Sequence, residues 1–449
     1  TGDDRLVRWT EKMLLRDPRF ADYFAERLAR GFVGTDEGQF VVYRRDRFSD
    51  WLSEQLAENR PYDEIVRQII SEDGLWTGRP ASNFVTAAVL EGDFDENELA
   101  GRTVRAFLGQ RIDCAQCHDH PFDDWTQQDF EGLAAHYGQV RLSMVGVTDK
   151  TEQDGRPIEY HIEDPLTESP RTVAPQVPFG EEWLPDEGTR RERLAAWVTH
   201  PENRRFERAI ANRVWGLMFG KAYLEPVDDL PDPPTKPGFF FKAGLLDLLG
   251  EDFREQGYDL RRLIHVIAAS RPFRLASTYA ADDPDQLAEA ELQWAVFPLT
   301  RLRPEQVIGS MIQATSVKTI DQNSHLVTRF IRLTRESDFV NQYGDLGENE
   351  LVDRTGTIPQ ALLRMNGRLA QETLGAGPFN ASGRIAAMAG SDEECLEACY
   401  LVCLTRRPAA EERQHFLPLL RGTKGKQRQQ AVEDIYWPLF NSIEFSWNH

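Results

Sequence analysis

Apolar residues near the start of the chain recur at the spacing of amphipathic helices. Intervals of three and four positions separate Leu6, Trp9, Met13 and Leu14, and again Phe20, Tyr23, Phe24 and Leu28. Further helices are predicted from Asp46, from Pro61 to Ile70 with proline in the first turn, and over residues 96–111. The last of these is expected to run straight into a cysteine motif at residues 114–118.

The pattern changes between Gly146 and Gly188, where prolines, glycines and charged residues are crowded together. Ile158, Tyr160 and Ile162 alternate with polar neighbours, which predicts a small β-hairpin within a linker. Helical periodicity resumes from about Thr189, and helices are expected over residues 194–197, 210–219, 245–253, 260–269, 304–314, 359–374, 394–404, 411–420 and 431–445. The predicted fold class is mainly α, with helical domains at residues 1–145 and 189–449 joined by a Pro/Gly-rich linker with short strands at 146–188.

The net charge and the hydropathy of the chain argue against nucleic-acid binding and against a transmembrane segment. The 449 residues include 52 basic and 73 acidic ones, a formal net charge of −21. Nucleic acid is therefore a poor partner, since phosphate backbones demand a basic surface. No stretch approaches the ~18–20 consecutive apolar residues that span a bilayer, so no transmembrane segment is expected. The chain begins at Thr1 without an initiator methionine, as expected if a leader or upstream segment has been removed.

The motif Cys114-Ala115-Gln116-Cys117-His118 is the strongest chemical signal. Two thiols three residues apart can add to the two vinyl groups of haem while the adjacent imidazole reaches the iron. The expected cofactor is one covalent haem c per chain, with Cys114 and Cys117 as anchors and His118 as the iron ligand. The candidates for a sixth iron ligand are Met144, His136, His161 and Met218, while His120 lies too near His118 in sequence to reach the opposite face of the haem.

Two other kinds of site compete with haem. Zinc takes thiolate and imidazole ligands tetrahedrally, so Cys114, Cys117 and His118 with His120 or an acidic residue such as Asp123 form an alternative metal site. Against zinc, the two ligand pairs of a zinc finger usually stand a dozen residues or more apart. A structural disulfide or redox dithiol is the third possibility, but the βαβ pattern that usually accompanies a redox dithiol is missing.

Charged residues around the motif permit a functional and a structural interpretation. Asp119, Asp123, Asp124 and Asp129 can relay protons or bind a cation, or they can form a solvated rim with helix caps, Thr126 among them. Arg102, Arg105 and Arg111 can neutralise haem propionates, or be ordinary helix-surface arginines. Far from the motif, Cys395, Cys399 and Cys403 recur every four residues on one predicted helix, which favours a buried core face.

Longer stretches resemble a known family. Phe107-Leu108-Gly109, the run Cys114–Asp123 and Trp125-Thr126-Gln127 are similar to a large uncharacterised family, rich in planctomycetes and described as cytochrome-c-associated. Its N-terminal domain is matched upstream by Arg44–Trp51 and Arg60–Asp63. Its partner domain is matched downstream by Ala211–Trp215, Phe219-Gly220, Val227–Asp229, Gly356–Leu362, Met365–Gly367, Arg406–Pro408, Asn441–Phe445 and Asn448-His449.

The resemblance implies an exported protein from a family of unassigned activity, often fused to a cytochrome-c-like domain. It nominates Asn212, Arg213, Trp215, Asp228 and Asp229 as neighbours of the site, although a packed tryptophan and a buried Arg–Asp pair holding two helices together is the structural alternative. The chain departs from the family near Phe239–Gly244, where members tend to carry a histidine-proline pair before Leu-Leu-Asp.

Three hypotheses follow from these residues. The first is a periplasmic or extracellular c-type haem protein that transfers electrons to a redox partner protein or oxidises a small-molecule or polysaccharide substrate. The second is a zinc or other metal-dependent protein, and the third is a non-catalytic exported binding or scaffold protein. No Ser/His/Asp arrangement, phosphate-binding glycine loop or nucleotide motif supports other classes.

Overall fold

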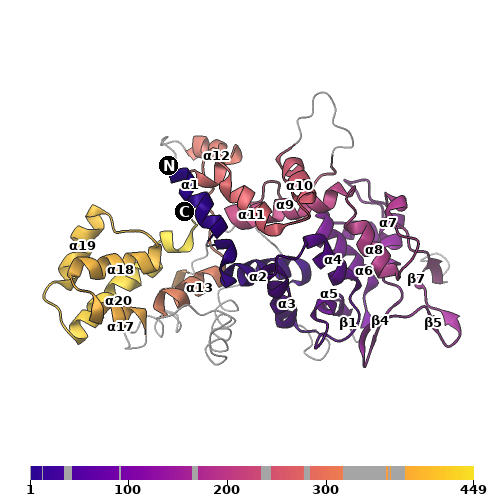
Figure 1. Cartoon of the computed structure of the whole chain (residues 1–449), viewed down its shortest axis with the longest axis horizontal. Helices are drawn as coiled ribbons and strands as arrows, with labels where there is room; N and C mark the ends of the chain where they lie inside the picture. The colour runs from indigo at the N-terminus through magenta and orange to yellow at the C-terminus, as the bar shows by residue number, and fades with distance from the viewer. Residues whose placement is uncertain are drawn as a thin grey trace. The chain divides into compact units, whose positions relative to one another are not determined.

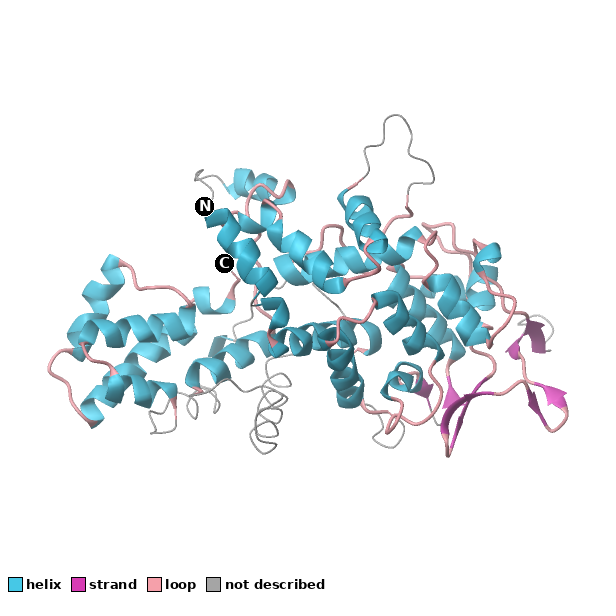
Figure 2. Ribbon diagram, viewed as in Figure 1, coloured by secondary structure: helices cyan, strands magenta, loops and turns pink. Residues whose placement is uncertain are grey.

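The computed structural model describes residues 2–12, 14–34, 43–90, 93–163, 170–233, 244–277, 284–316, 361–362, 365 and 380–448. Helices dominate these residues, so the mainly α fold class is confirmed (Figures 1 and 2). The described residues up to Arg274 form one compact unit, and those from Leu275 onward form a second. No helix among the described residues has both the length and the apolar character to cross a membrane.

The first unit is built mainly from helices. Its α-helices are α1 (Gly2–Lys12), α2 (Pro18–Val33), α3 (Arg45–Ala57), α4 (Tyr62–Ser71), α5 (Asn83–Thr86), α6 (Glu96–Thr103), α7 (Gln127–Ala134), α8 (Arg190–Val198), α9 (Arg204–Phe219), α10 (Leu245–Glu255) and α11 (Leu260–Ala269). Short 3-10 helices are η1 (Leu14–Arg16), η2 (Pro80–Ser82), η4 (Asp113–Gln116), η5 (Glu181–Trp183) and η6 (Pro272–Arg274), and η3 (Val104–Leu108) is a π-helix.

Strands in the first unit form four antiparallel hairpins at one edge (Figure 2). They pair β1 (Val89–Leu90) with β2 (Asp93–Phe94), β3 (Val140–Ser143) with β4 (Gly146–Asp149), β5 (Glu152–Gln153) with β6 (Arg156–Pro157), and β7 (Tyr160–Glu163) with β8 (Pro170–Val173). The alternating run Ile158–Ile162 thus enters β7, whose Tyr160 is buried and His161 exposed. The Pro/Gly-rich region holds several short hairpins where one was predicted.

Aromatic packing forms the core around the helix that precedes the cysteine motif. Phe107 lies with its ring centroid 5.0 Å from that of Phe32 and 5.4 Å from that of Phe84. Tyr62 stacks on Phe206 at 5.3 Å, which joins α4 to α9. Since α9 also packs on α10, α11 and η3, it is the central helix of this unit.

A fully buried arginine, Arg191, links α8 by hydrogen bonds to residues 70–73 and to Asp149. Arg191 donates to Asp149 Oδ1 at 2.9 Å, to the carbonyls of Ile70 and Glu72 at 3.1 Å each, and pairs with Asp73. Burial alone would lower the pKa of Arg191, but the two carboxylates outweigh it and raise that pKa. Residues 190–274 therefore belong to the same compact unit as residues 2–163, whereas the predicted division fell at 146–188.

The helix predicted over residues 96–111 is present as α6 and η3, but it ends at Leu108 and does not run into the cysteine motif. α6 passes into η3, which stops at Leu108 because Gly109 adopts a left-handed conformation with φ +65°. The left-handed region favours glycine at a helix C-terminus. The following residues leave the helix axis before the cysteine motif begins.

The second unit is a smaller helical bundle. Its helices are α12 (Pro284–Leu292), α13 (Pro304–Thr315), α17 (Ala381–Met388), α18 (Asp392–Leu404), α19 (Ala410–Leu420), α20 (Lys426–Asn441) and the 3-10 helix η7 (Glu444–Ser446). Their core includes Cys395, Cys399 and Cys403, so the predicted buried cysteine face is confirmed. The helix predicted over residues 359–374 lies outside the described residues, apart from Ala361, Leu362 and Met365.

Replacing Gly109 by alanine is expected to destabilise the chain more than replacing Gly257. Both glycines have positive φ, +65° and +70°, where alanine costs about 1–2 kcal/mol. A Cβ on Gly109 would stand 3.0 Å from Ala209 Cβ and 3.3 Å from Leu230 Cδ1, but one on Gly257 would meet nothing within 4 Å. The free energy of unfolding from urea titrations should therefore fall by a further ~1–3 kcal/mol in Gly109→Ala. Equal losses in the two variants would contradict this packing.

Stability is expected to fall on acidification because of His136. This side chain is 1% exposed, its Nδ1 donates to the Arg190 carbonyl at 3.1 Å, and burial lowers its pKa from 6.5 to about 4. Between those two values the unfolded chain takes up a proton that the folded chain does not. The free energy of unfolding should lose about 1.4 kcal/mol per pH unit as pH falls from 6.5 towards 4, with no contribution above 6.5.

Urea titrations of His136→Gln across pH 4.5–7 test this, because glutamine keeps an N–H donor without the titration. The variant should lose that part of the pH dependence. His161→Gln, at an exposed site on β7, serves as the control and should keep the wild-type slope. An unchanged slope in His136→Gln would refute the assignment.

Candidate functional site

The cysteine motif forms a short helical turn at the surface. η4 is a 3-10 helix over Asp113–Gln116, and Cys117 continues it with φ −111° and ψ −24°. Side chains three residues apart eclipse on such a helix, so Cys114 and Cys117 share one face of the turn. Both thiols are exposed and neither is in a disulfide. The turn therefore carries two free, exposed thiols three residues apart.

The backbone of this turn packs against the rest of the first unit. Ile112 and Ala115 are fully buried, and the Ala115 N–H donates to the Ile112 carbonyl at 2.8 Å. The turn approaches α6 closely at Gly101, where an added Cβ would stand 3.0 Å from Asp113 Oδ1. The thiols are thus held on a fixed support while their own side chains stay accessible.

His118 follows the turn with an exposed imidazole. Its Nδ1 lies 2.7 Å from the backbone oxygen of Asp119. A carbonyl only accepts hydrogen bonds, so Nδ1 carries the proton and the lone pair of the neutral ring is on Nε2. Histidines that bind metals commonly have this arrangement, with the second nitrogen donating to a carbonyl.

The loop after His118 is tied back to α7. Asp119 Oδ1 accepts the Gln127 N–H at 2.9 Å, and the His120 N–H donates to the Trp125 carbonyl at 2.7 Å. Gln127 Nε2 reaches back to the Gln116 carbonyl at 3.4 Å. Asp119 therefore orients the loop, although the sequence suggested a proton relay or a cation ligand as well as a cap.

The predicted cap of α7 is confirmed. Thr126 Oγ1 accepts the Asp129 N–H at 3.1 Å, and the Asp129 carboxylate accepts the Thr126 N–H at 2.9 Å. This reciprocal pair satisfies two backbone donors that the first turn of a helix leaves free. The Asp129 carboxylate is therefore already hydrogen-bonded at the N-terminus of α7.

His120 and Asp123 form a pair of their own within the loop. His120 Nδ1 lies 3.2 Å from Asp123 Oδ2 and 3.4 Å from the Phe122 nitrogen. One ring nitrogen cannot donate to a carboxylate and accept from an N–H at once, so these two contacts exclude each other. Phe122 itself is 91% exposed. His120 is engaged with its own loop, apart from the thiols.

A second set of hydrogen bonds holds residues 109–110, which directly precede the motif region. The Leu230 N–H donates to the Gly109 carbonyl at 2.7 Å, and Gln110 Nε2 donates to Asp232 Oδ1 at 2.7 Å. Arg205 binds both side chains, at 2.9 Å to Gln110 Oε1 and 2.6 Å to Asp232 Oδ1. The sequence analysis missed Gln110, Arg205 and Asp232, because no local spacing signals contacts between residues about a hundred positions apart.

Arg111 adds further hydrogen bonds to this set. Its backbone N–H donates to Asp229 Oδ1 at 3.2 Å, and its guanidinium donates to Asp228 Oδ1 at 2.8 Å and 3.1 Å. The hydrogen bonds that Arg111 donates to Asp228 raise the pKa of Arg111. Arg111, Asp228 and Asp229 therefore position the backbone just before the motif.

Asn212, Arg213 and Trp215 are fully or almost fully buried in α9. Asn212 accepts the Leu224 N–H at 2.9 Å and donates to the Leu224 carbonyl at 2.9 Å, which closes the loop after α9. Arg213 donates to the Ala106 carbonyl in η3 at 2.6 Å. Trp215 stacks on Phe219 at 4.3 Å. The Arg213 hydrogen bond thereby links α9 to η3, the helix that precedes the motif.

The candidate zinc ligands do not converge. Within the described part of the chain, no three or more His, Cys, Asp or Glu side chains form a group able to hold a metal ion. Cys114, Cys117, His118, His120 and Asp123 all belong to that part. The motif thus presents separate, accessible donors and has no preformed tetrahedral cluster.

A maleimide reagent is expected to modify Cys114 and Cys117 rapidly in native protein made in a reducing cytosol. Cys395, Cys399 and Cys403 are buried, so they should react only after unfolding. Peptide mass spectrometry after timed labelling identifies each site. Cys114→Ser/Cys117→Ser should show no rapid labelling, while rapid labelling of Cys395 or Cys399 would contradict the structure.

Comparison with known proteins identifies two families of unknown function. Residues 4–141 match the family described as PSCyt2, protein of unknown function (DUF1549), and residues 190–420 match the family described as PSD1, protein of unknown function (DUF1553). No curated protein matches the chain, and no solved structure does. The second match covers just over half of the 449 residues and begins at the helix that Arg191 anchors. The chain belongs to the PSD1 (DUF1553) family, and it carries a PSCyt2 (DUF1549) segment ahead of that region.

Proposed function

We propose that this chain is a c-type haem protein with a redox role in the periplasm or outside the cell. In this proposal Cys114 and Cys117 form thioether bonds to one haem, and His118 binds the iron through Nε2. The haem, when bound, supplies one-electron redox chemistry. The chain's own residues would anchor it through Cys114 and Cys117, offer the His118 imidazole to the iron and fix the turn that carries these side chains.

One observation carries this proposal: the two thiols are free, exposed and three residues apart on one short helical turn. Covalent attachment requires thiols that are unpaired, accessible and spaced to meet two vinyl groups. Cys114 and Cys117 are both exposed and free. Their three-residue spacing on a 3-10 turn puts them on the same side. The residues present therefore fit the group.

The state of His118 supports the same conclusion. Its Nδ1 donates to the Asp119 carbonyl at 2.7 Å, which orients the ring and leaves Nε2 as the nitrogen available to a metal. A second hydrogen bond of this kind normally raises the basicity of a ligating imidazole. Asp119 is fixed in turn, because its carboxylate accepts the Gln127 N–H. The axial ligand would thus be held by a loop that is already ordered.

The zinc alternative receives less support from the geometry. A tetrahedral zinc site needs four donors that converge on one point. His120 is instead paired with Asp123, and no such group forms among the described residues. A scaffold without a cofactor remains the third hypothesis, and it predicts that the thiols can be replaced without loss of binding. The redox partner protein, or the small-molecule or polysaccharide substrate, would meet the protein near this turn.

The decisive measurement is a pyridine haemochrome spectrum of the chain exported to a periplasm with cytochrome-c maturation. We expect about one covalently bound haem c per chain. Cys114→Ser/Cys117→Ser should carry none, and His118→Ala should keep haem with an altered axial-ligand spectrum, because the thioether bonds do not depend on the imidazole.

Cys403→Ser is the matched control, since its thiol is buried in the second unit. It should carry haem like the wild type. Zinc analysis of the same samples separates the alternative: stoichiometric zinc without haem in the wild type would overturn the proposal in favour of a metal site. Neither haem nor zinc would favour the scaffold.

A further inference from the structure

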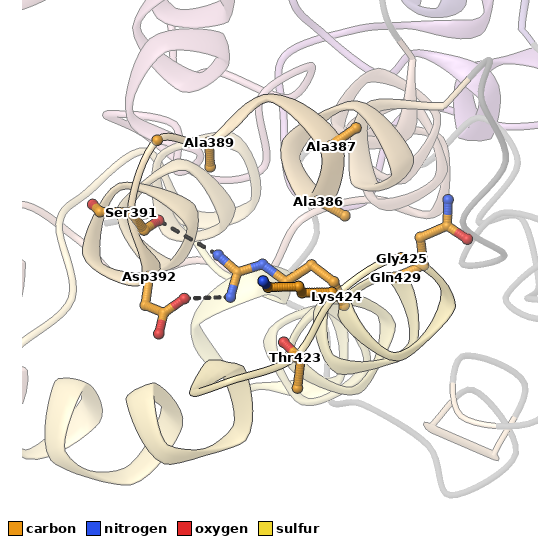
Figure 3. A pocket seen from close by; sticks show the side chains of 11 residues that line it. Ala386, Ala387, Ala389, Ser391, Asp392, Thr423, Lys424, Gly425 and Gln429 are labelled. Atoms are coloured by element: carbon orange, nitrogen blue, oxygen red, sulfur yellow. Dashed lines mark hydrogen bonds and ion pairs between the residues drawn. The ribbon is translucent and has the colours of Figure 1, made fainter.

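A hollow in the second unit has no role in the proposed haem site. Its volume is about 450 Å³, and its lining comes from the end of α17, the start of α18 and the start of α20 (Figure 3). Sites for small organic molecules usually measure ~300–1,000 Å³. The hollow is therefore large enough to hold such a molecule.

The charged side chains of the lining sum to a positive charge. Lys424 and Arg428 contribute one positive charge each and Asp392 one negative charge, which leaves +1. The whole chain, in contrast, has a formal net charge of −21. Residues 421–428 strengthen the difference, because they include four basic residues and no acidic one. The hollow therefore attracts anions on a protein whose net charge repels them.

Hydrogen bonds fix the guanidinium of Arg428 at the hollow. Its Nη1 pairs with Asp392 and donates to the Leu420 carbonyl at 3.0 Å, and its Nη2 reaches the Ser391 carbonyl at 3.5 Å (Figure 3). None of these oxygens meets Nε, so the Nε–H has no oxygen acceptor among the described residues. A guanidinium binds oxyanions through two parallel N–H groups. Arg428 is thus held in place and keeps donor capacity for a ligand.

Lys424 supplies a second cation to the same hollow. Its side chain is exposed, and it forms no ion pair within the part of the chain that the structure describes. The Lys424 and Arg428 side chains run in the same direction across the hollow in Figure 3. Like charges that share a hollow repel each other, and an anion bound to both relieves that repulsion.

Small side chains leave the remainder of the hollow open. Ala386, Ala387 and Ala389 present methyl groups from the α17 side (Figure 3). Gly425, the residue before α20, has no side chain that could fill the space. The partial positive charge at the N-terminus of α20 adds to the charge of the two cations. The hollow thus has a cationic side and an apolar side.

We propose that this hollow binds a small organic phosphate ester. Lys424 and Arg428 hold the phosphate group, and the alanine side faces the organic part. A phosphate monoester has a charge of about −1.5 to −2 near neutral pH and three acceptor oxygens that point in different directions. It can therefore engage two separate cations at once. A bare ion would fill only part of a hollow of this size.

The test is equilibrium dialysis of the full chain against phenyl phosphate, inorganic phosphate and phenol. Salt at about 0.15 M screens attraction from charges more than ~8 Å away. We expect about one phenyl phosphate per chain, bound about tenfold or more tightly than inorganic phosphate because the ring contacts the alanine side. Phenol, which lacks the anionic group, should not bind measurably.

Lys424→Met should weaken the binding of phenyl phosphate about tenfold or more, because one charge-assisted contact is lost. Lys426→Met is the matched control: it removes the same charge from an exposed lysine two residues later that does not line the hollow. Its affinity should stay within about twofold of the wild type. Arg428→Lys keeps the charge but loses the planar fork, and it should also weaken binding about tenfold. Circular dichroism checks the fold of that variant, since Arg428 also holds Asp392.

The proposal is overturned if the wild-type chain retains no phenyl phosphate, or if the two lysine variants weaken its binding equally. Equal affinities for phenyl phosphate and inorganic phosphate would replace the ester by the free ion. Phenyl sulfate that binds as tightly as phenyl phosphate would overturn the assignment to phosphate. The hollow lies wholly within the second unit, so none of these outcomes depends on haem.

Discussion

The placement of the cysteine motif depends on the contact between residues 109–111 and residues 228–232. Gly109 turns the chain out of η3 with a positive φ, and its carbonyl accepts the Leu230 N–H. Gln110 and Arg111 then bind Asp232, Asp228 and Asp229. The motif begins directly after this anchored segment. The orientation of its thiols therefore rests on hydrogen bonds to a segment more than a hundred residues later in the chain.

This contact explains why the two family matches and the compact units divide the chain at different places. The matches cover residues 4–141 and 190–420, whereas the first compact unit runs to Arg274. Helices α8 and α9 lie in the second match but pack with the first, through Arg191 and Arg213. Sequence families follow segments of related sequence, but compactness follows buried contacts, and here the buried contacts cross the boundary between the two families.

The two groups of cysteines differ in their surroundings, and this difference decides their chemistry. Cys114 and Cys117 are exposed on a short turn, which suits covalent attachment of a large group from solvent. Cys395 and Cys399 are fully buried in the core of the second unit. Burial disfavours the charged thiolate, so buried thiols are less reactive than thiols that water can reach.

The sequence by itself determined the features that depend on neighbours a few residues away. Apolar periodicity predicted the mainly α fold and the buried cysteine face, Thr126 with Asp129 predicted the cap of α7, and the spacing of Cys114, Cys117 and His118 located the candidate site. Only the tertiary structure decided where the helix before the motif ends, that Arg213 binds the Ala106 carbonyl, and that Arg111 reaches Asp228. The physical reason is the distance along the chain over which each interaction acts. Helix periodicity and capping are local interactions of the chain with itself, whereas these hydrogen bonds join residues brought together only when the aromatic core around Phe107 packs.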